Sequence, residues 1–542
     1  MEKVKFTDGL WNSEINVADF VYNNIAPYEG DASFLQGPSA RTMKLWNECL
    51  EALAEERDRG GVRSIDAKTI STITSHAAGY IDKDNELIVG LQTDELLKRA
   101  IKPFGGWRVV EKACHENGVE LDPRVKEIFT HYRKSHNDGV FDVYTDEILK
   151  FRKLGFLTGL PDNYSRGRII GDYRRIALYG IDRLIEAKQQ DLKNLTGPMT
   201  DARINLREEV AEQIKALKEM KQLGEMYGLE LGRPAETAQE AVQWVYMGYL
   251  AAVKEQDGAA MSLGNVSSFL DIYIHRDLES GLIDETFAQE LVDQFVMKLR
   301  MVRHLRMQSY NDIFAGDPTW VTEALAGRYN DGKIKVTKTS FRFLQTLYNL
   351  GPAPEPNMTV LWSPSLPEGF KEFCAKVSVD TSSVQYENDD LMRKIRGEED
   401  YGIACCVSYQ AVGKAIQFFG ARANLAKALL LALHKSPGDG AEILQEDRWR
   451  NDLADQIKGK KLHIRKVSDF DKAQVTTGGV ALSELQADTL ELIKYPGIYV
   501  TGELADVDGI CGGYNLQWAW SSGHLAGQSA ACALKTKIRS RS

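Results

Sequence analysis

Apolar and polar positions along the chain predict helices that alternate with short strands. Between residues 201 and 227, apolar residues recur every three or four positions among Glu, Lys and Arg, which predicts an amphipathic helix with a solvated charged face. Residues 241–253 are far more apolar, so we expect a buried helix that ends near residues 257–258. Residues 357–362 follow a proline-rich stretch and predict a buried strand, whereas residues 386–390 are interpreted as a loop.

Helices that alternate with short apolar strands indicate an α/β architecture. A barrel is one such arrangement, although periodicity alone does not close it. The sequence contains no repeat at a fixed period and no low-complexity tract. At roughly 150 residues per domain, 542 residues predict three or four domains, unless one large barrel takes up most of the chain.

Composition places the chain among soluble globular proteins. Apolar residues make up 43% and charged residues 27% of the sequence, and the mean hydropathy is −0.33. A net charge of −10 without a Lys/Arg cluster argues against a nucleic-acid partner. No stretch approaches the ~20 apolar residues of a membrane span, and the first residues lack the apolar core of a signal peptide. Seven scattered cysteines are too few for a disulfide framework, so we expect a reducing compartment, the cytoplasm.

Two cysteines stand next to each other at Cys405 and Cys406. Adjacent thiols do not form a routine zinc knuckle, which needs two or more residues between its ligands. A disulfide between neighbours requires a strained ring. The pair is therefore either a reactive thiol site or two buried thiols that behave as small hydrophobic side chains.

A second candidate site lies in residues 159–175, where four arginines stand among glycines and aromatic residues. Glycines let a guanidinium approach a ligand closely, and the planar fork of Arg grips a carboxylate through two bonds. A small carboxylic acid is therefore a candidate ligand. The alternative is salt bridges to Asp and Glu, which we expect for at least two of these arginines. His76, in a Ser/Thr-rich stretch without a GxSxG elbow, is interpreted as structural.

The sequence around the cysteine pair resembles the active-site loop of pyruvate formate-lyase, a glycyl radical enzyme. In that loop the neighbouring cysteines are followed by VGK and by QFFGARANLAK, which stand here at residues 412–414 and 417–427. The resemblance is nearly continuous from about Trp11 to about His434. It implies a partial α/β barrel of that family, with many surrounding helices, over residues 1–434.

This resemblance implies a formate C-acetyltransferase of anaerobic fermentation, which converts pyruvate and coenzyme A to acetyl-CoA and formate. Cys405 matches the thiyl that attacks pyruvate, and Cys406 matches the thiol that first receives the radical from glycine. Arg168 and Arg422 match the two arginines that hold the substrate carboxylate. The aromatic pocket of the family is matched by Phe314, Trp320 and Phe419. The family further implies a homodimer and a radical-activating enzyme as a partner.

The residue types suit a radical reaction. Heterolytic cleavage of the bond between the carboxylate and carbonyl carbons of pyruvate would leave an acyl anion without an electron sink. Addition of a Cys405 thiyl to the carbonyl would weaken that bond, release a radical that becomes formate, and leave an acetyl thioester for coenzyme A. Aromatic residues around the loop would exclude water and oxidants.

The C-terminal part departs from this family. The family's radical loop has the form RVxGYxxRF, which is absent from residues 435–542, where Gly513-Tyr514 lacks the flanking Arg-Val and Arg-Phe. The second half of the family's barrel is missing too. The glycyl radical is therefore expected to come from outside this chain, for example from a donor subunit.

From about residue 462 the sequence instead resembles the C-terminal end of BaiN-type FAD-dependent oxidoreductases, through QVTTGGV, PGIYVTGE and GGYNLQWAWSS. The positions that lie against FAD in that family match Gly502, Glu503, Asp506, Gly512, Gly513, Asn515 and Leu516. A flavin site also needs a strand, a GxGxxG turn and a helix for the pyrophosphate, and nothing before the tail supplies them. Residues 462–542 are therefore interpreted as a fragment of an FAD-binding domain, and FAD itself is not expected to bind.

Residues 435–461 form the junction, which indicates a fusion, a gene-level rearrangement or an artefact of sequence assembly. Two alternatives to the radical lyase follow from it. The chain could be a catalytically incomplete remnant that acts as an interaction subunit, or an FAD-dependent oxidoreductase.

Overall fold

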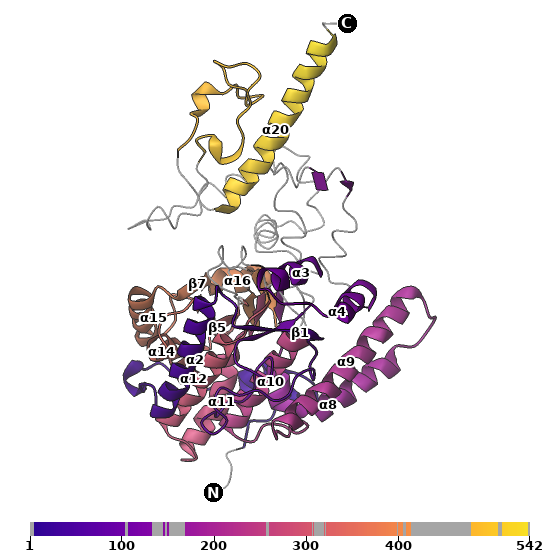
Figure 1. Cartoon of the computed structure of the whole chain (residues 1–542). Helices are drawn as coiled ribbons and strands as arrows, with labels where there is room; N and C mark the ends of the chain where they lie inside the picture. The colour runs from indigo at the N-terminus through magenta and orange to yellow at the C-terminus, as the bar shows by residue number, and fades with distance from the viewer. Residues whose placement is uncertain are drawn as a thin grey trace. The chain divides into compact units, whose positions relative to one another are not determined.

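The computed structural model describes residues 5–102, 107–132, 145–146, 149–150, 168–255, 260–305, 307, 319, 321–397, 399–404, 408–412, 478–507 and 512–539 (Figure 1). The chain divides into two compact units, Met1–His434 and Lys435–Ser542. The first is built largely from helices and also contains parallel strands, so its fold is mixed α/β.

The helices of the first unit that the structure describes are α1 (Val17–Asn24), α2 (Ala40–Asp58), α3 (Trp107–Glu116), α4 (Pro123–Glu127), α8 (Arg174–Asn194), α9 (Asp201–Met226), α10 (Ala238–Glu255), α11 (Val266–Glu279), α12 (Glu285–Arg300), α14 (Lys338–Asn349), α15 (Glu368–Thr381) and α16 (Asp389–Arg396). Its strands are β1 (Ser64–Ile70), β2 (Lys98–Ile101), β3 (Arg168–Ile170), β4 (Ala260–Ser262), β5 (Thr322–Ala326), β6 (Asn357–Trp362), β7 (Val384–Asn388), β8 (Tyr401–Ala404) and β9 (Ser408–Ala411).

Five parallel strands follow one another in chain order. β3 pairs with β4, β5 pairs with β6, and β6 pairs with β7, all parallel. The two groups are joined just beyond β4, where the Ala324 amide donates to the Gly264 carbonyl at 2.7 Å and the Leu263 amide donates to the Thr322 carbonyl at 2.9 Å. Helices lie between successive strands in the sequence, as parallel pairing requires. A separate parallel pair is formed by β1 and β2.

A β-hairpin, β8–β9, packs against this sheet on both of its own faces. The strands are antiparallel, with Ala404 opposite Ser408. Tyr401 and Ile403 pack with Ala324 of β5 and Leu361 of β6. Alternate residues of a strand point to opposite faces, and Ala404 accordingly packs with Ile170 of β3. Strands of the same sheet therefore lie on both faces of the hairpin.

The close approach of hairpin and sheet depends on a pair of glycines. A Cβ atom added at Gly402 would lie 2.7 Å from the Gly264 Cα and 3.0 Å from the Ile170 Cδ1. Real Cβ atoms do not approach a backbone carbon so closely, because interiors are already packed at crystal density. Glycine at position 402 therefore lets β8 lie directly against the junction of β4 and β5.

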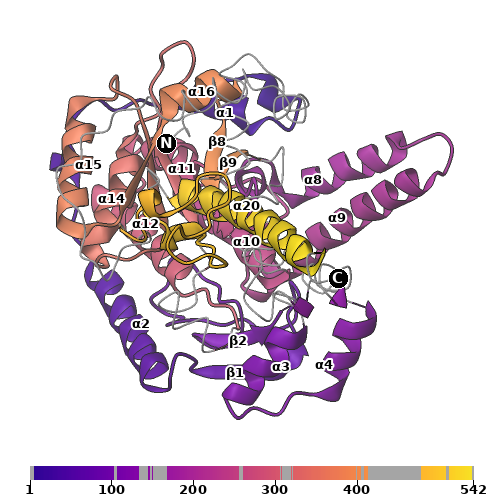
Figure 2. The same cartoon turned by 90° about the horizontal axis from the view of Figure 1, so that it is seen from above.

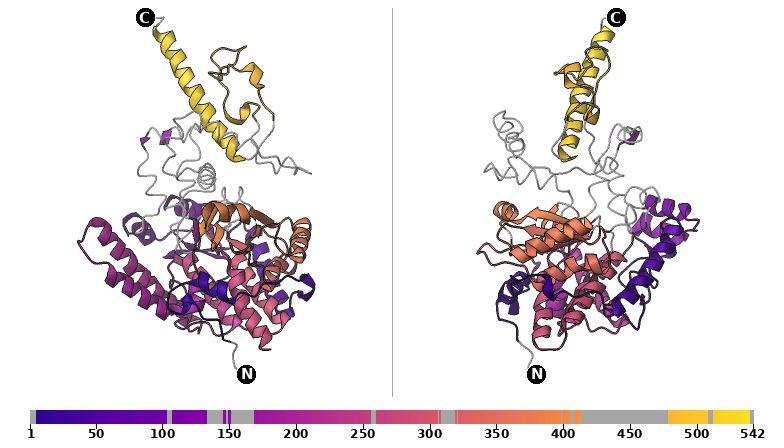
Figure 3. Two further views of the ribbon diagram at one scale, coloured as in Figure 1. Left: turned by 180° about the vertical axis from the view of Figure 1, so that it is seen from behind. Right: turned by 90° about the vertical axis from the view of Figure 1, so that its left-hand side faces the viewer.

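The main core lies among the helices that cover the sheet. α10 is buried along most of its length and packs against α8, α11 and α12. By contrast, α8 and α9 form a side-by-side pair that reaches outward from the rest of the unit (Figure 2), as the view from behind in Figure 3 also shows. The N-cap Thr200 accepts a hydrogen bond from the Arg203 amide and begins α9.

The structure confirms most of the predicted elements. The amphipathic helix is α9, the buried helix is α10 and the buried strand is β6, within a few residues of the expected bounds. α10 ends at Glu255, and the expected stop at residues 257–258 lies outside the described residues. The loop predicted at residues 386–390 is wrong, because these residues complete β7 and begin α16. Polar residues are accommodated in this strand because Gln385 accepts a hydrogen bond from Asn357 and Glu387 is hydrogen-bonded to Gln385.

The second unit, as far as it is described, has a small core of its own. Leu485, Leu490, Val500, Ala505 and Ala526 form a buried cluster. Its elements are the 3-10 turns η6 (Leu482–Glu484) and η7 (Gly502–Leu504) and the long helix α20 (Gly512–Arg539). Strand pairing among these described residues is limited to isolated bridges. Over the described residues of both units, no helix is long and apolar enough to span a membrane.

Substituting Gly402→Ala is expected to destabilise the first unit by about 1–3 kcal/mol, because the new methyl group meets backbone that cannot move aside. Urea unfolding followed by circular dichroism measures this. Gly37→Ala is the matched control, because a Cβ at Gly37 meets nothing within 4 Å. We expect the control to be neutral or slightly stabilising. Equal stability of the two variants would contradict the close packing of the hairpin.

Candidate active site

Most residues implicated by the sequence fall outside the described part of the chain. Cys405 and Cys406 stand between the two strands of the hairpin, one and two peptide bonds after Ala404, but are themselves outside the described residues. The same holds for Arg422, Phe314, Trp320 and Phe419. Arg168 is the first residue of β3, and its backbone is described while its side chain is not. The site is therefore built from the elements that lead to these residues.

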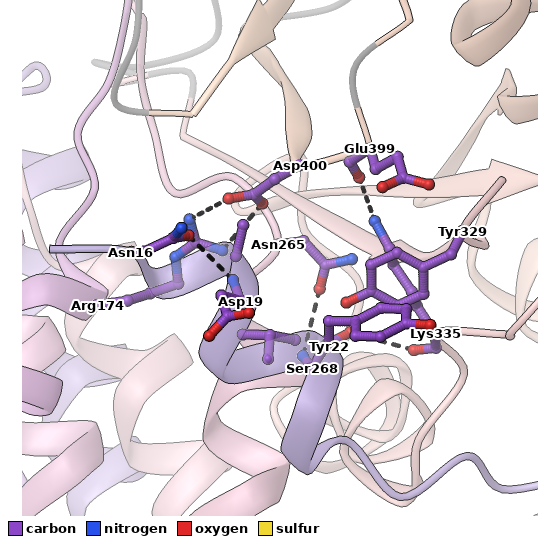
Figure 4. Close-up of a pocket in the computed structure, with 12 residues that line it drawn as sticks. Asn16, Asp19, Tyr22, Arg174, Asn265, Ser268, Tyr329, Lys335, Glu399 and Asp400 are labelled. Carbon is purple, nitrogen blue, oxygen red and sulfur yellow. Dashed lines mark hydrogen bonds and ion pairs between the residues drawn. The ribbon is translucent and has the colours of Figure 1, made fainter. Parts of the chain in front are cut away.

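Arg174, which follows β3, holds the base of the hairpin (Figure 4). The Arg174 guanidinium is 2% exposed and donates to both carboxylate oxygens of Asp400, at 3.0 and 2.7 Å. Its Nε donates to Asp172 at 2.8 Å, and Arg175 donates to the other oxygen of Asp172 at 3.1 Å. Burial opposes the charge, but the two carboxylates outweigh it and raise the pKa of Arg174. The salt-bridge interpretation is thus confirmed for two of the four arginines.

The residues on either side of Asp400 are also held. The Lys335 ammonium donates to the Glu399 backbone carbonyl, and the Glu399 carboxylate accepts from the Asn330 amide at 2.7 Å. The Tyr401 hydroxyl donates to Asp389 at 2.7 Å. We call Arg174, Lys335 and Asp389 the hairpin clamp, because they fix three consecutive residues at the start of β8.

Asp389 is itself rigidly placed. It is 1% exposed, and its second oxygen accepts from Arg393 Nε at 3.0 Å and from the Arg328 amide at 3.1 Å. Burial raises the pKa of Tyr401, and the adjacent Asp389 carboxylate raises it further. The Tyr401 hydroxyl is therefore a permanent donor to this carboxylate.

The hairpin brings the chain before Cys405 close to the strand that carries Arg168. Ala404, the last described residue before Cys405, packs against Ile170 in one small buried cluster. Ile170 is two residues after Arg168 on β3, a separation of about 6.6 Å along a strand. The backbone of Arg168 and the chain that leads into the cysteine pair therefore belong to the same neighbourhood.

A cavity of about 370 Å³ adjoins the hairpin clamp (Figure 4). Its walls include Arg174, Lys335, Glu399 and Asp400, and the rings of Tyr22 and Tyr329 meet edge to face at 4.9 Å. The charged groups in these walls pair with one another or with backbone groups. Because these groups are already paired, the cavity is interpreted as a space beside the base of β8 and not as a substrate pocket.

Polar side chains continue along the sheet face beside the hairpin. Asn357 donates to Gln385 at 2.9 Å, and Thr359 donates to Asn357 at 3.3 Å. Glu387 is in register with Leu361, which packs on the hairpin. Burial raises the pKa of Glu387 to about 7. This carboxyl group was missed from sequence because its strand was interpreted as a loop.

His76 is partnered on both ring nitrogens. Its Nδ1 lies 2.7 Å from Ser75 Oγ and its Nε2 lies 3.1 Å from Asp66 Oδ2. Ser75 Oγ also donates to the Thr72 carbonyl and accepts from the Thr72 amide, both at 3.0 Å. Burial lowers the pKa of His76, assisted by the charge of Lys254. These contacts fit the structural role expected for His76. Among the described residues, no cluster of His, Cys, Asp and Glu could hold a metal ion.

In the second unit, some of the residues matched to an FAD site are brought together. Asn515 is buried near the start of α20 and donates to the Glu503 carboxylate at 3.1 Å, while Trp518 donates to the Gly502 carbonyl at 2.9 Å. Asp506 is exposed. The backbones of Gly512, Gly513 and Leu516 lie in the first turns of α20. The described part of this unit has no strand followed by a glycine-rich turn for a pyrophosphate, so its residues do not fit FAD.

Substituting Glu387→Gln is expected to change how stability depends on pH. Because the folded pKa of Glu387 is raised, the unfolded chain loses the proton first, and stability falls as pH rises from about 4.5 to about 7. The variant lacks this loss, so it should gain about 1–2 kcal/mol relative to the parent above pH 7 and little at pH 4, allowing for partial exposure. Unfolding at pH 4, 6 and 8 tests this, with the exposed Glu372→Gln as the control. A pH-independent difference would contradict the burial of Glu387.

The chain is similar to known proteins over most of its length. The family model described as pyruvate formate lyase-like matches residues 10–446. Formate acetyltransferase of Haemophilus influenzae is 51% identical over 543 aligned positions, which cover 93% of this chain and 70% of that protein. Because only about 40 residues of this chain are left unmatched, the alignment enters residues 462–542.

Solved structures show the same fold at low sequence identity. The B12-independent glycerol dehydratase of Clostridium butyricum matches with a TM-score of 0.55 and 18% identity, over 70% of this chain and 56% of that one. Hydroxyproline dehydratase of Clostridioides difficile matches with a TM-score of 0.54 and 17% identity, over 70% and 56%. The chain thus spans little more than half the length of these two structures. With its family match and its curated relative, the chain belongs to the pyruvate formate lyase-like family.

Proposed function

We propose that the chain is a formate C-acetyltransferase, which cleaves pyruvate with coenzyme A to acetyl-CoA and formate. The observation that carries the proposal is 51% identity to a formate acetyltransferase over 93% of the chain. The described structure supports it, because a clamped hairpin leads directly into the adjacent thiols Cys405 and Cys406.

In the proposed reaction Cys405 carries the attacking sulfur. Its thiyl adds to the carbonyl carbon of pyruvate, and the bond to the carboxylate carbon breaks homolytically, leaving an acetyl thioester on Cys405 and a carbon dioxide radical anion. A hydrogen atom from the Cys406 thiol converts that anion to formate and leaves a thiyl on Cys406. The acetyl group then passes to the thiol of coenzyme A, which restores the Cys405 thiol and conserves one unpaired electron.

Arg168 and Arg422 are proposed to hold the pyruvate carboxylate, because a guanidinium fork offers two parallel donors to a planar carboxylate. Phe314, Trp320 and Phe419 are proposed to line the pocket and keep water from the radical. The position of Arg168 at the start of β3, beside the hairpin, supports its part in this set.

A glycyl radical supplies the first hydrogen-atom abstraction, which generates the thiyl. The 542 residues contain no RVxGYxxRF loop, so the proposal includes a glycyl radical from outside these residues, installed by an activating enzyme. A homodimer and a cytoplasmic location are part of the same proposal. Coenzyme A acts as cosubstrate.

The finer description of the fold is also a proposal. We infer a partial barrel over residues 1–434, and five parallel strands with a hairpin packed by them on both of its faces support it. Residues 435–461 would be a junction and residues 462–542 a flavoprotein-like fragment. The alternatives are an incomplete remnant that serves as an interaction subunit, and an FAD-dependent oxidoreductase.

Substituting Cys405→Ala or Cys406→Ala is expected to lower formate production roughly a thousandfold or more, because each removes a group that the reaction consumes and regenerates. The assay is anaerobic, with pyruvate, coenzyme A, an activating enzyme and a glycyl-radical donor subunit. Cys532→Ser, at an exposed position on α20, is the control and should retain parental activity. Formate production by the Cys405→Ala variant at the parental rate would refute the proposal.

The absorbance of the purified protein separates the flavin alternative. We expect no yellow chromophore and no flavin released on denaturation, because the described tail lacks a strand and turn for the pyrophosphate. Flavin recovered at one equivalent per chain, and lost in a variant lacking residues 462–542, would favour the oxidoreductase instead.

A further inference from the structure

The buried guanidinium of Arg174 joins two elements that the proposed reaction uses. Asp172 and Arg174 follow directly after β3, the strand that begins with Arg168. Asp400 directly precedes β8, the strand that leads to Cys405. Three donors of one side chain therefore tie the end of the Arg168 strand to the start of the cysteine strand.

The other members of the hairpin clamp come from different parts of the unit. Lys335 stands before α14, and Asp389 is the first residue of α16. They hold Glu399 and Tyr401, the neighbours of Asp400. Arg174 is thus the member of the clamp that relates the hairpin to β3.

Small movements at the base of the hairpin are amplified at the end of β8. Ala404, the last described residue before Cys405, is four residues beyond Asp400, about 13 Å along a strand. A tilt of about 5° at Asp400 would therefore displace Ala404 by about 1 Å. Misplacement by about 1 Å can cost about a hundredfold in rate. The fork of Arg174 fixes both the distance and the orientation of the Asp400 carboxylate, which a single ion pair would not do.

Packing alone does not hold the base of β8. Arg174, Glu399 and Asp400 line the cavity of about 370 Å³, so the carboxylate of Asp400 has empty space beside it. If the bidentate pair were lost, the Asp400 carboxylate could shift into this space, while Lys335 and Asp389 would still hold the residues on either side of it. The ion pair therefore fixes the position of this carboxylate relative to the chain after β3.

We propose that Arg174 is a positioning residue, which sets the Cys405 and Cys406 thiols against the pyruvate carboxylate held from the Arg168 strand. It touches neither substrate nor thiol and acts through Asp400. The inference rests on the proposed function and adds a residue that coordinates two parts of the site.

The test compares Arg174→Lys with Arg342→Lys. Arg342 is equally buried, at 1% exposure, and pairs with Glu285 and Asp271 away from the hairpin. We expect Arg174→Lys to lower kcat about 10–100-fold with KM for pyruvate within about twofold, because positioning acts on the reacting geometry. The Arg342→Lys control should lose less than about threefold in kcat. Equal effects of the two variants would overturn the inference.

A second measurement does not depend on the radical. In the unactivated full-length protein, iodoacetamide alkylates Cys405 and Cys406 at rates that peptide mass spectrometry resolves. Arg174→Lys is expected to change the ratio of these rates at least about threefold, and Arg342→Lys to leave it unchanged. An unchanged ratio in Arg174→Lys would overturn the inference, even if the parent protein makes no formate. Absence of formate from the fully activated parent would instead count against the proposed function.

A third variant covers failure of Arg174→Lys to fold. Asp400→Asn keeps the shape of the carboxylate and should reproduce the fall in kcat and the altered alkylation ratio. Where both singles fold, the Arg174→Lys/Asp400→Asn double variant should be no worse than the more impaired single, because the two side chains act as one unit. Parental kcat and alkylation ratio in Asp400→Asn, or additive losses in the double variant, would overturn the inference.

Discussion

The position of the β8–β9 hairpin relative to β3 depends on the ion pairs of one buried guanidinium. Moving a charge out of water costs several kcal/mol, and Arg174 recovers that cost only because Asp172 and Asp400 occupy three of its donors in good geometry. Buried ion pairs add little to net stability compared with apolar packing, but they fix relative positions closely. The pairs of Arg174 hold a helix start, the end of a parallel strand and the base of a hairpin in one arrangement.

Around this contact, the sheet and the hairpin show how an α/β fold positions the chain that leads into Cys405. Parallel strands need long connections, so the helices fill one side of the sheet and form the main core. The other side is left to the hairpin, which packs between strands instead of adding to an edge. The small side chains Gly264, Gly402 and Ala404 make room for it.

Local patterns in the sequence predicted individual elements well. In α9, α10 and β6, residues close in sequence decide which face is buried and which is exposed. Their hydrophobic pattern alone therefore predicted these elements. β7 was missed because its inner face is polar in part, where Gln385 accepts a hydrogen bond from Asn357 and Glu387 is hydrogen-bonded to Gln385. The pairing of Arg174 with Asp400 was missed too, since the two residues are 226 positions apart and only the fold brings them together. The catalytic assignments came from family resemblance, and the described structure supplies the frame around them.

Both faces of β8 are enclosed, and this restricts which substitutions the stretch before the cysteines can accept. A larger residue at position 402 or 404 would collide with β3 or with the chain just after β4. A polar residue at position 403 would lose the apolar contacts that Ile403 makes with Ala324 and Leu361. The residues Gly-Ile-Ala at positions 402–404 are therefore restricted by the volume available to them, independently of any chemistry. Sharing of these residues with a relative would therefore reflect the limited volume around them. Only the cysteines that follow bear on a shared reaction.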